Sequence, residues 1–215
     1  MFNIITVARE YGSGGAQIAQ MLADRLGWKL LDRCLIETIA KRAHVDPSIV
    51  VELDEHPDPW LTQLTQAFTQ YSTYLPGGQP DVLDTKALAS VTRQVIEEAA
   101  RIGNCVIVGR GSQCILQRRN NVFHTFIYAP RQERLNRLRQ RHPTPEDAEA
   151  ALEARDRERA DHVRQIYGQD WTNPHLYHLM LCSSMGEEAA VSIILGAMDL
   201  SREKELTGNQ GVPKR

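Results

Sequence analysis

The sequence lacks an excess of charge of either sign. Its 215 residues carry 25 Lys and Arg against 27 Asp and Glu, which leaves a formal net charge of −2. A chain without a global positive field has no long-range attraction for a nucleic-acid backbone or an anionic membrane. We therefore expect small-molecule partners, with no nucleic acid and no membrane among them, and any basic chemistry must be local.

Long apolar runs and paired cysteines are also missing. No window reaches the roughly 18 apolar residues that a membrane helix needs, and Met1 to Ala8 lack the pattern of a signal peptide. The four cysteines form no C-x-x-C pair, and three of them lie in apolar runs, so buried free thiols are favoured over metal ligands or disulfides. We expect a cytoplasmic protein. The sequence leaves its oligomeric state open and is compatible with a homo-oligomer.

Apolar, β-branched segments alternate with helical patterns along the chain. The expected strands are Phe2 to Ala8, Trp28 to Leu31, Cys105 to Val108, Phe123 to Ala129 and His178 to Cys182. This alternation predicts an α/β fold, a parallel sheet flanked by helices in three layers, with ligands beyond the carboxyl ends of the strands. We expect one domain over residues 1–200, a helical insertion at about 45–85, a lid-like helical segment at about 142–170 and a disordered tail over 201–215.

A glycine-rich turn, Gly12-Ser13-Gly14-Gly15, follows the first expected strand and precedes a helix. In that context backbone N–H groups can point at an anion, and the helix dipole adds a favourable potential. Against the phosphate-loop pattern G-x-x-x-x-G-K-[ST], residues 9–16 keep only the second glycine. Gly15 replaces the lysine, and Ala16 replaces the hydroxyl that would hold Mg²⁺. Gly12 to Ala16 are thus a candidate phosphate site without its own ammonium group.

Arg9 takes the place of the first glycine of that pattern. Its guanidinium can grip phosphate through two parallel hydrogen bonds, so it is our candidate for the missing cation. The alternative is a structural tight turn in which Arg9 pairs with Glu10 or is solvated. The loop alone does not decide between the two.

Four segments after the loop, read together, resemble one family. They are G-W-K-L-L-D at 27–32, V-I-V-G-R-G at 106–111, F-I-Y-A-P-R-Q-E-R at 126–134 and R-D-R-E-R at 155–159. With the opening I-T-V-A-R-E-Y-G-S-G-G they are similar, in order, to the cytidylate kinase-like family. The resemblance implies a P-loop nucleoside-triphosphate hydrolase type of fold with a small lid, and ATP and Mg²⁺ as cofactors.

The same resemblance assigns Asp32, Arg33 and Arg110 to the acceptor side. Asp32 could instead cap the following helix, and Arg110 could form a buried salt bridge at its turn. Val108 and Gly111 replace both aspartates of the family's D-G-R-D, so the acceptor is either a nucleoside monophosphate or another small molecule.

The late helix contributes further arginines. Arg157 and Arg164 share one helical face, and Arg155, Arg159 and His162 share the adjacent face. Arginines brought in by a closing lid would stabilise the charge of a transferring phosphoryl group, and we select Arg157, Arg159 and Arg164 for this role. The alternative is a solvated face of intrahelical ion pairs.

Our leading hypothesis is ATP-dependent phosphoryl transfer to a small acceptor, most readily a nucleoside monophosphate. The rival is a nucleotide-binding sensor that has kept the phosphate cradle but lost turnover, which the absent lysine and hydroxyl both motivate. A dinucleotide-binding enzyme is a weaker third option, because residues 12–17 do not satisfy G-x-G-x-x-G.

Overall fold

The structure is a computed structural model, which describes residues 1–32, 85–142 and 144–208, with backbone only over 85–88 and 202–208. Several expectations lie outside the described residues. They concern Arg33, two helices that the apolar spacing of the sequence predicts at 34–44 and 60–68, and the insertion at about 45–85 apart from its last residue. The division into one domain with these insertions stays a prediction.

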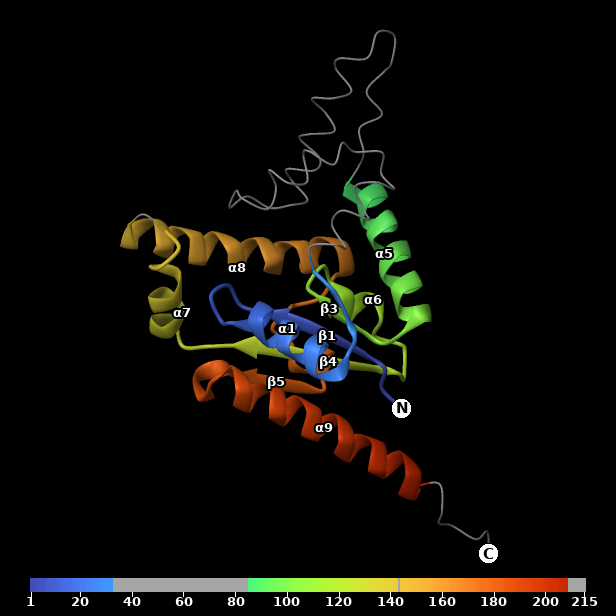
Figure 1. The fold of residues 1–215 in the computed structure, drawn as a ribbon. Helices are drawn as coiled ribbons and strands as arrows, with labels where there is room; N and C mark the ends of the chain where they lie inside the picture. Colours follow the sequence, from blue (N-terminus) through green and yellow to red (C-terminus); the bar gives the residue numbers. More distant parts are fainter. Residues whose placement is uncertain (33–84, 143, 209–215) are drawn as a thin grey trace, which may run out of the picture.

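Five parallel strands form one sheet in the order β2-β3-β1-β4-β5 (Figure 1). They are β1 (Ile4–Arg9), β2 (Lys29–Leu31), β3 (Cys105–Val108), β4 (Val122–Tyr128) and β5 (Leu179–Cys182). β1 lies at the centre, paired with β3 through Ile5 and Val106 and with β4 through Ile5 and Phe123. Any loop that leaves β1 therefore lies in the middle of the carboxyl edge, where parallel sheets bind ligands.

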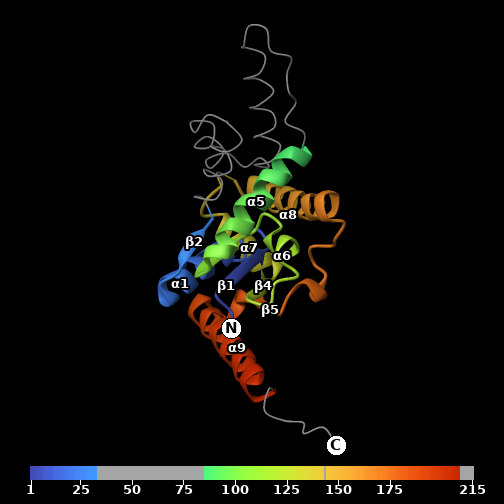
Figure 2. The ribbon, with the colours of Figure 1, turned by 90° about the vertical axis from the view of Figure 1, so that its right-hand side faces the viewer.

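Helices cover both faces of the sheet, as Figures 1 and 2 show. One face packs against α1 (Gly15–Leu26) and α9 (Glu187–Gly208), with Ile5 and Val7 of β1 in that core. The other face packs Ala8 and Phe126 against Val163 of α8 (Pro145–Tyr167). Neighbouring strand residues point to opposite faces, so continuous apolar strands such as Cys105–Val108 fill both cores. The expected three-layer α/β fold is confirmed.

Three further helices complete the described part of the fold. They are α5 (Thr85–Ile102), α6 (Ser112–Ile115) and α7 (Arg131–Leu138). The run Thr144-Pro145-Glu146-Asp147 predicts a helix start, and α8 begins there, because the Thr144 side chain accepts a hydrogen bond from the Asp147 amide and Pro145 occupies the first turn. Among the described residues, no helix combines the length and apolarity needed to cross a bilayer.

The carboxyl-terminal helix is longer than expected. The sequence predicts a closing helix over 187–200 and a disordered tail over 201–215, but α9 continues to Gly208. Residues 202–206 are Arg, Glu, Lys, Glu and Leu, which all have high helix propensity, so a polar stretch continues the helix. Residues 201–208 thus belong to α9, residues 209–215 lie outside the described residues, and the expected tail stays a prediction.

A buried histidine makes the fold sensitive to acid. His124 in β4 is 4% exposed, its Nδ1 lies 2.7 Å from Thr6 Oγ1, and burial together with the nearby His178 lowers its pKa to about 4. Its unfolded pKa is 6.5, so unfolding takes up a proton between these values, and stability is lost as pH falls below 6.5. From pH 7 to pH 5 we expect a loss of about 2 kcal/mol from this group.

Urea denaturation at both pH values measures this effect. His124→Gln should be less stable than the wild type at pH 7 but should lose less stability on acidification. His175→Gln, at an exposed position, is the control and should keep the wild-type pH dependence. Equal pH dependence in all three proteins would contradict the role of His124.

Candidate phosphate-binding site

The loop between β1 and α1 is held in one backbone conformation. Gly12 and Gly14 have φ of 76° and 79°, values that glycine adopts without steric cost. Gly12 also lies against α7, because an added Cβ would be 3.1 Å from the Arg134 carbonyl oxygen and from Leu138 Cγ. A larger residue at position 12 would push the loop away from the helix that supports it.

Every carbonyl group from Arg9 to Gly14 accepts a hydrogen bond from the protein. Three oxygens are bound by arginines: Arg9 O by Arg159 Nη1 (3.2 Å), Tyr11 O by Arg134 Nη1 (3.3 Å) and Gly12 O by Arg137 Nη1 (3.3 Å). Ser13 O accepts from Ser183 Oγ at 2.6 Å, and the oxygens of Glu10 and Gly14 accept from amides of Ser13 and Ile18. The carbonyls are thus fixed by α7, α8, α1 and the segment after β5.

The amides of the same loop are largely unused. Within the described residues, no group accepts a hydrogen bond from the N–H of Gly12, Gly14, Gly15 or Ala16. In a trans peptide the N–H points opposite to the C=O of the preceding residue, so the Gly12 and Gly14 amides point away from Arg134 and Ser183, which bind the Tyr11 and Ser13 carbonyls. Gly15 and Ala16 open α1, where N–H groups lack intrahelical partners. Such a set of amides is suited to an anion.

Arg9 fills the space that a phosphate-loop lysine would need. An added Cβ on Gly15 would lie 2.6 Å from Arg9 Cβ and 3.0 Å from Arg9 Cγ. The Arg9 guanidinium reaches Gly109 at the end of β3, where an added Cβ would collide with Nη1, and its Nη2 lies 3.8 Å from Asp32 Oδ1. Arg9 forms its ion pair with Asp32, so the alternative pairing of Arg9 with Glu10 is not the one observed.

Arg159 brings a second guanidinium to the loop. It donates to the Arg9 carbonyl, lies 5.6 Å from the centre of the Tyr11 ring, and also donates to Asp156 Oδ1 at 3.4 Å. Burial and repulsion from Arg9 lower the pKa of Arg159 to about 9, and burial also lowers the pKa of Arg9. Two partly buried guanidinium groups that repel each other are costly to the fold, and a bound anion would relieve this cost.

Asp156 and Arg134 form a buried ion pair behind the loop. Asp156 Oδ1 also accepts from the Tyr11 amide at 2.7 Å, and Arg134 Nε lies 3.4 Å from Glu10 Oε2. Glu10 in turn accepts from the Ala129 amide at 3.1 Å, and burial raises the pKa of its carboxyl group. These contacts join α7, α8 and the end of β4 to the loop.

Arg110 lies in the turn that follows β3, between two glycines. Its φ is 58°, a left-handed value that is uncommon outside glycine, asparagine and aspartate. Tyr167 of α8 packs on Gly111, where an added Cβ would collide with its ring, and the Tyr167 hydroxyl lies 3.5 Å from Arg110 O. Burial and the charge of Arg110 lower the pKa of His162 to about 4, so this imidazole is neutral at pH 7.

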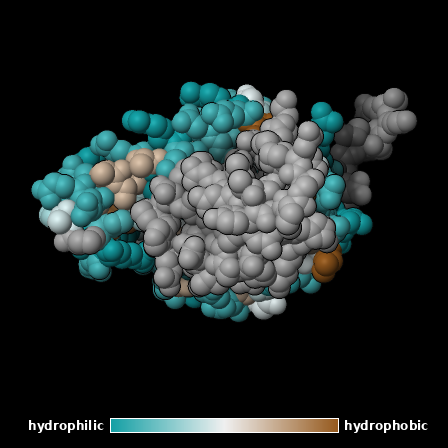
Figure 3. Space-filling view, turned by 90° about the horizontal axis from the view of Figure 1, so that it is seen from above, coloured by the Kyte–Doolittle hydropathy of each residue, from teal (hydrophilic) through white to brown (hydrophobic). Residues whose placement is uncertain are grey.

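The structure brings together only part of the expected site. Arg9, Asp32, Arg159 and the loop lie at the carboxyl ends of β1 and β2, and the Arg9 side chain reaches the turn that holds Arg110. Arg157 and Arg164 are exposed on α8, and no contact joins them to the described loop; in the view from above, the part of the surface that is not grey is mainly hydrophilic (Figure 3). The catalytic roles of Arg157 and Arg164 stay predictions.

Sequence reasoning missed four residues that hold the loop, namely Arg134, Arg137, Asp156 and Ser183. Arg134 and Asp156 belong to segments that carried the family resemblance. Their membership in those segments was a signal that these two charged side chains could face the loop. Ser183 gives no such signal, because an isolated serine after a strand is common and its partner, Ser13, is 170 residues away.

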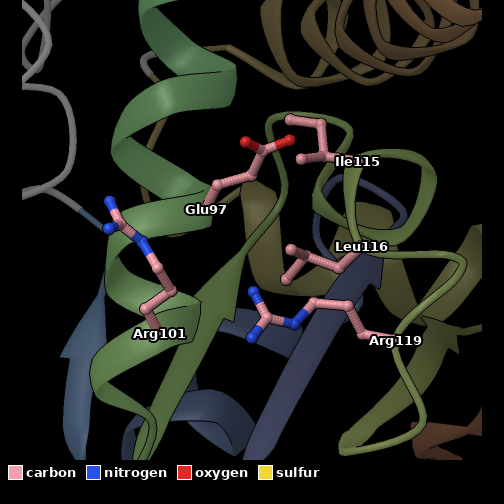
Figure 4. A pocket seen from close by; sticks show the side chains of 5 residues that line it. All are labelled: Glu97, Arg101, Ile115, Leu116 and Arg119. Carbon is pink, nitrogen blue, oxygen red and sulfur yellow. The ribbon is translucent and has the colours of Figure 1, made fainter.

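A pocket of about 280 Å³ lies elsewhere, between α5 and the end of α6 (Figure 4). Glu97 and Arg101 of α5 line it together with Ile115, Leu116 and Arg119. Arg101 is at the end of α5 that precedes β3, so the pocket is near the amino end of that strand. It does not belong to the phosphate loop.

Comparisons with known proteins agree with this architecture. The chain is similar to an uncharacterized protein from Eubacterium ventriosum, with 18% identity, a TM-score of 0.64, and coverage of 91% of this chain and 98% of that one. It is also similar to shikimate kinase from Bacteroides thetaiotaomicron, with 14% identity, a TM-score of 0.50, and coverage of 95% and 98%. At these identities the likeness concerns the fold.

A search of curated proteins gave no significant match. Residues 4–185, by contrast, match the family model described as cytidylate kinase-like. The match includes the lysine-free loop, the Arg110 turn and α8, and it confirms the resemblance inferred from the sequence. This chain belongs to the cytidylate kinase-like family.

Proposed function

We propose that the protein is an ATP-dependent phosphotransferase that acts on a small acceptor, most readily a nucleoside monophosphate. One observation carries the proposal: four of the five amides from Gly12 to Ala16 lack acceptors within the described residues, while every carbonyl from Arg9 to Gly14 is bound. The stem of Arg9 packs against Gly15, and its partly buried guanidinium reaches Gly109 at the neighbouring strand end. Such a loop supplies both the hydrogen bonds and the charge that a triphosphate needs.

The donor phosphates would lie on the amides of Gly12 to Ala16. Arg9 would take the role of the missing lysine, because its stem covers Gly15 and its guanidinium lies at the ends of three strands. The positive charge of Arg159 would stabilise the negative charge that builds up on the transferring oxygens. This chemistry needs positioning and charge stabilisation, and it requires no covalent nucleophile.

The acceptor would lie beside Asp32 and Arg110, with Arg33 next in the chain. Arg110 would bind an anionic group of the acceptor, and Asp32 would orient its hydroxyl or phosphate. Arg157 and Arg164 would join the site if α8 moves toward the ligand when it binds. The departures at Val108 and Gly111 leave the base of a nucleotide acceptor unspecified.

Mg²⁺ would accompany ATP at this site. Within the described residues, no group of three or more His, Cys, Asp or Glu forms a metal cage. Mg²⁺ commonly uses only one or two carboxylates together with phosphate oxygens and waters, and Asp32 is a partly exposed carboxylate at the end of β2. Asp32 would therefore hold the ion through water. Bound Mg²⁺ would neutralise charge on the donor oxygens.

A nucleotide-binding sensor is the second candidate function. The observation that favours it is the absence of both the lysine and the hydroxyl at positions 15 and 16. A sensor would bind ATP through the same amides without turnover.

Two measurements separate the kinase from the sensor. One is a phosphoryl-transfer assay with labelled ATP and a panel of nucleoside monophosphates and small hydroxylated acids, and the other is calorimetric measurement of ATP binding. We expect binding and product with at least one acceptor. ATP binding without product across the panel would support the sensor instead. The absence of binding to ATP, ADP and inorganic tripolyphosphate would reject both.

A further inference from the structure

The conformation of the phosphate loop depends on two side chains that are far from it in sequence. Arg137 of α7 donates to the Gly12 carbonyl at 3.3 Å and to Ser183 Oγ at 3.4 Å. Ser183 Oγ donates to the Ser13 carbonyl at 2.6 Å. Ser183 is fully buried and lies in the turn after β5. Arginine, serine and loop carbonyls form one continuous chain of hydrogen bonds.

The order of donors in this chain is fixed by chemistry. A guanidinium can only donate, so the Ser183 oxygen must accept from Arg137. The single hydroxyl hydrogen of Ser183 is then directed at the Ser13 carbonyl. Arg137 therefore anchors the Gly12 carbonyl directly and the Ser13 carbonyl through Ser183.

The Ser13 carbonyl belongs to the same planar peptide group as the Gly14 amide. The glycine at position 14, with φ of 79°, has no side chain to prevent that peptide group from rotating. Ser183 holds the carbonyl, so the opposite end of the peptide group, the Gly14 N–H, keeps its direction toward the candidate anion site. A hydrogen bond at the carbonyl also polarises the peptide group and strengthens its N–H as a donor.

We propose that Arg137 and Ser183 are positioning residues for oligophosphate binding: they act on the ligand through the loop peptide groups that they hold, above all the one that presents the Gly14 amide. This inference rests on the proposed function. It explains how a loop without the usual lysine could keep its amides preorganised before the ligand arrives, since preorganised donors need no reorganisation on binding. The ligand class is a di- or triphosphate, whichever nucleoside it carries.

Ser183→Ala and Arg137→Met test the proposal, with matched controls from the same two regions. Ser192→Ala also removes a serine hydroxyl that donates to a backbone carbonyl, Glu188 O at 2.9 Å, but on the exposed side of α9. Arg139→Met removes an exposed arginine at the end of α7. Inorganic tripolyphosphate and ATP are the ligands, measured by calorimetry below the unfolding temperature of every variant.

We expect both test variants to bind ATP and tripolyphosphate about 10- to 100-fold more weakly, a change of about 1.4–2.8 kcal/mol in binding free energy, since a preorganised donor is lost. The loss should be equal for the two ligands, because in the proposed site the base and ribose would not contact this peptide group. The two controls should bind as the wild type does. Arg137→Lys, which keeps a cationic donor, should recover part of the lost affinity.

Amide NMR spectra separate positioning from a general loss of stability. In the wild type, tripolyphosphate should shift the Gly14 amide proton downfield, and this shift should disappear in Ser183→Ala while the protein stays folded. Wild-type affinity in both test variants would overturn the inference and leave the proposed function standing. A wild-type protein that binds neither ligand would overturn both.

Discussion

Methionine in place of Arg9 is expected to abolish most of the phosphoryl transfer and to weaken ATP binding. The substitution keeps an apolar stem against Gly15 and removes the guanidinium beside the candidate phosphates. A cation that acts on developing phosphoryl charge is commonly worth about 10²- to 10³-fold in turnover. ATP affinity should fall about 10-fold or more, because a charge-assisted hydrogen bond is lost.

Steady-state kinetics and calorimetry measure these two effects. Arg25→Met is the control, because Arg25 forms an exposed ion pair with Glu188 and has no recorded contact with the loop. Unchanged turnover and unchanged ATP affinity in Arg9→Met would remove Arg9 from the site. Weaker binding in a protein that never shows turnover would instead favour the sensor function.

A reciprocal exchange gives a sharper test of the same idea. Gly15→Lys alone should disturb the loop, since the new Cβ would lie 2.6 Å from Arg9 Cβ. Arg9→Gly together with Gly15→Lys removes this collision and recreates the first glycine and the lysine of the phosphate-loop pattern. We expect the double variant to bind ATP more tightly than either single variant. Additive losses in the double variant would contradict the view that the two positions exchange roles.

Asparagine in place of Asp156 is expected to cause a large loss of stability. The carboxylate pairs with Arg134 and Arg159 and accepts from the Tyr11 amide, and its side chain is only 19% exposed. Removing one partner of a buried ion pair costs about 3–5 kcal/mol, because the remaining charges stay desolvated. The Glu10 carboxylate still offsets the charge of Arg134, so we expect a loss of unfolding free energy near the lower end of this range.

Glu153→Gln on the same helix is the matched control for Asp156→Asn. Glu153 pairs with Arg131 at 3.3 Å, but the two side chains are 63% and 50% exposed. An exposed ion pair contributes about 0–1 kcal/mol, so this substitution should scarcely change the free energy of unfolding. Urea denaturation measures both variants. Similar small losses would show that the Asp156 cluster is solvated in solution.

Local patterns in the sequence determined the elements of this fold. The strand Cys105–Val108 was predicted with the bounds observed, because a continuous apolar run between two glycine turns fits a strand buried on both faces. Thr144 and Pro145 marked the start of α8, since capping depends on adjacent residues. The glycine loop was equally visible, because its positive φ values at Gly12 and Gly14 require that residue type.

Tertiary structure decided which charges face the loop. Both arginine faces of α8 were visible as helical spacings, but only the packing of α8 on α7 and the loop turned Arg159 and Asp156 inward. Arg9 could have paired with Glu10, yet the approach of β2 and β3 placed Asp32 and Gly109 beside it. Ser183 reaches Ser13 across 170 positions. Such contacts depend on how distant segments meet, which neither residue type nor local spacing encodes.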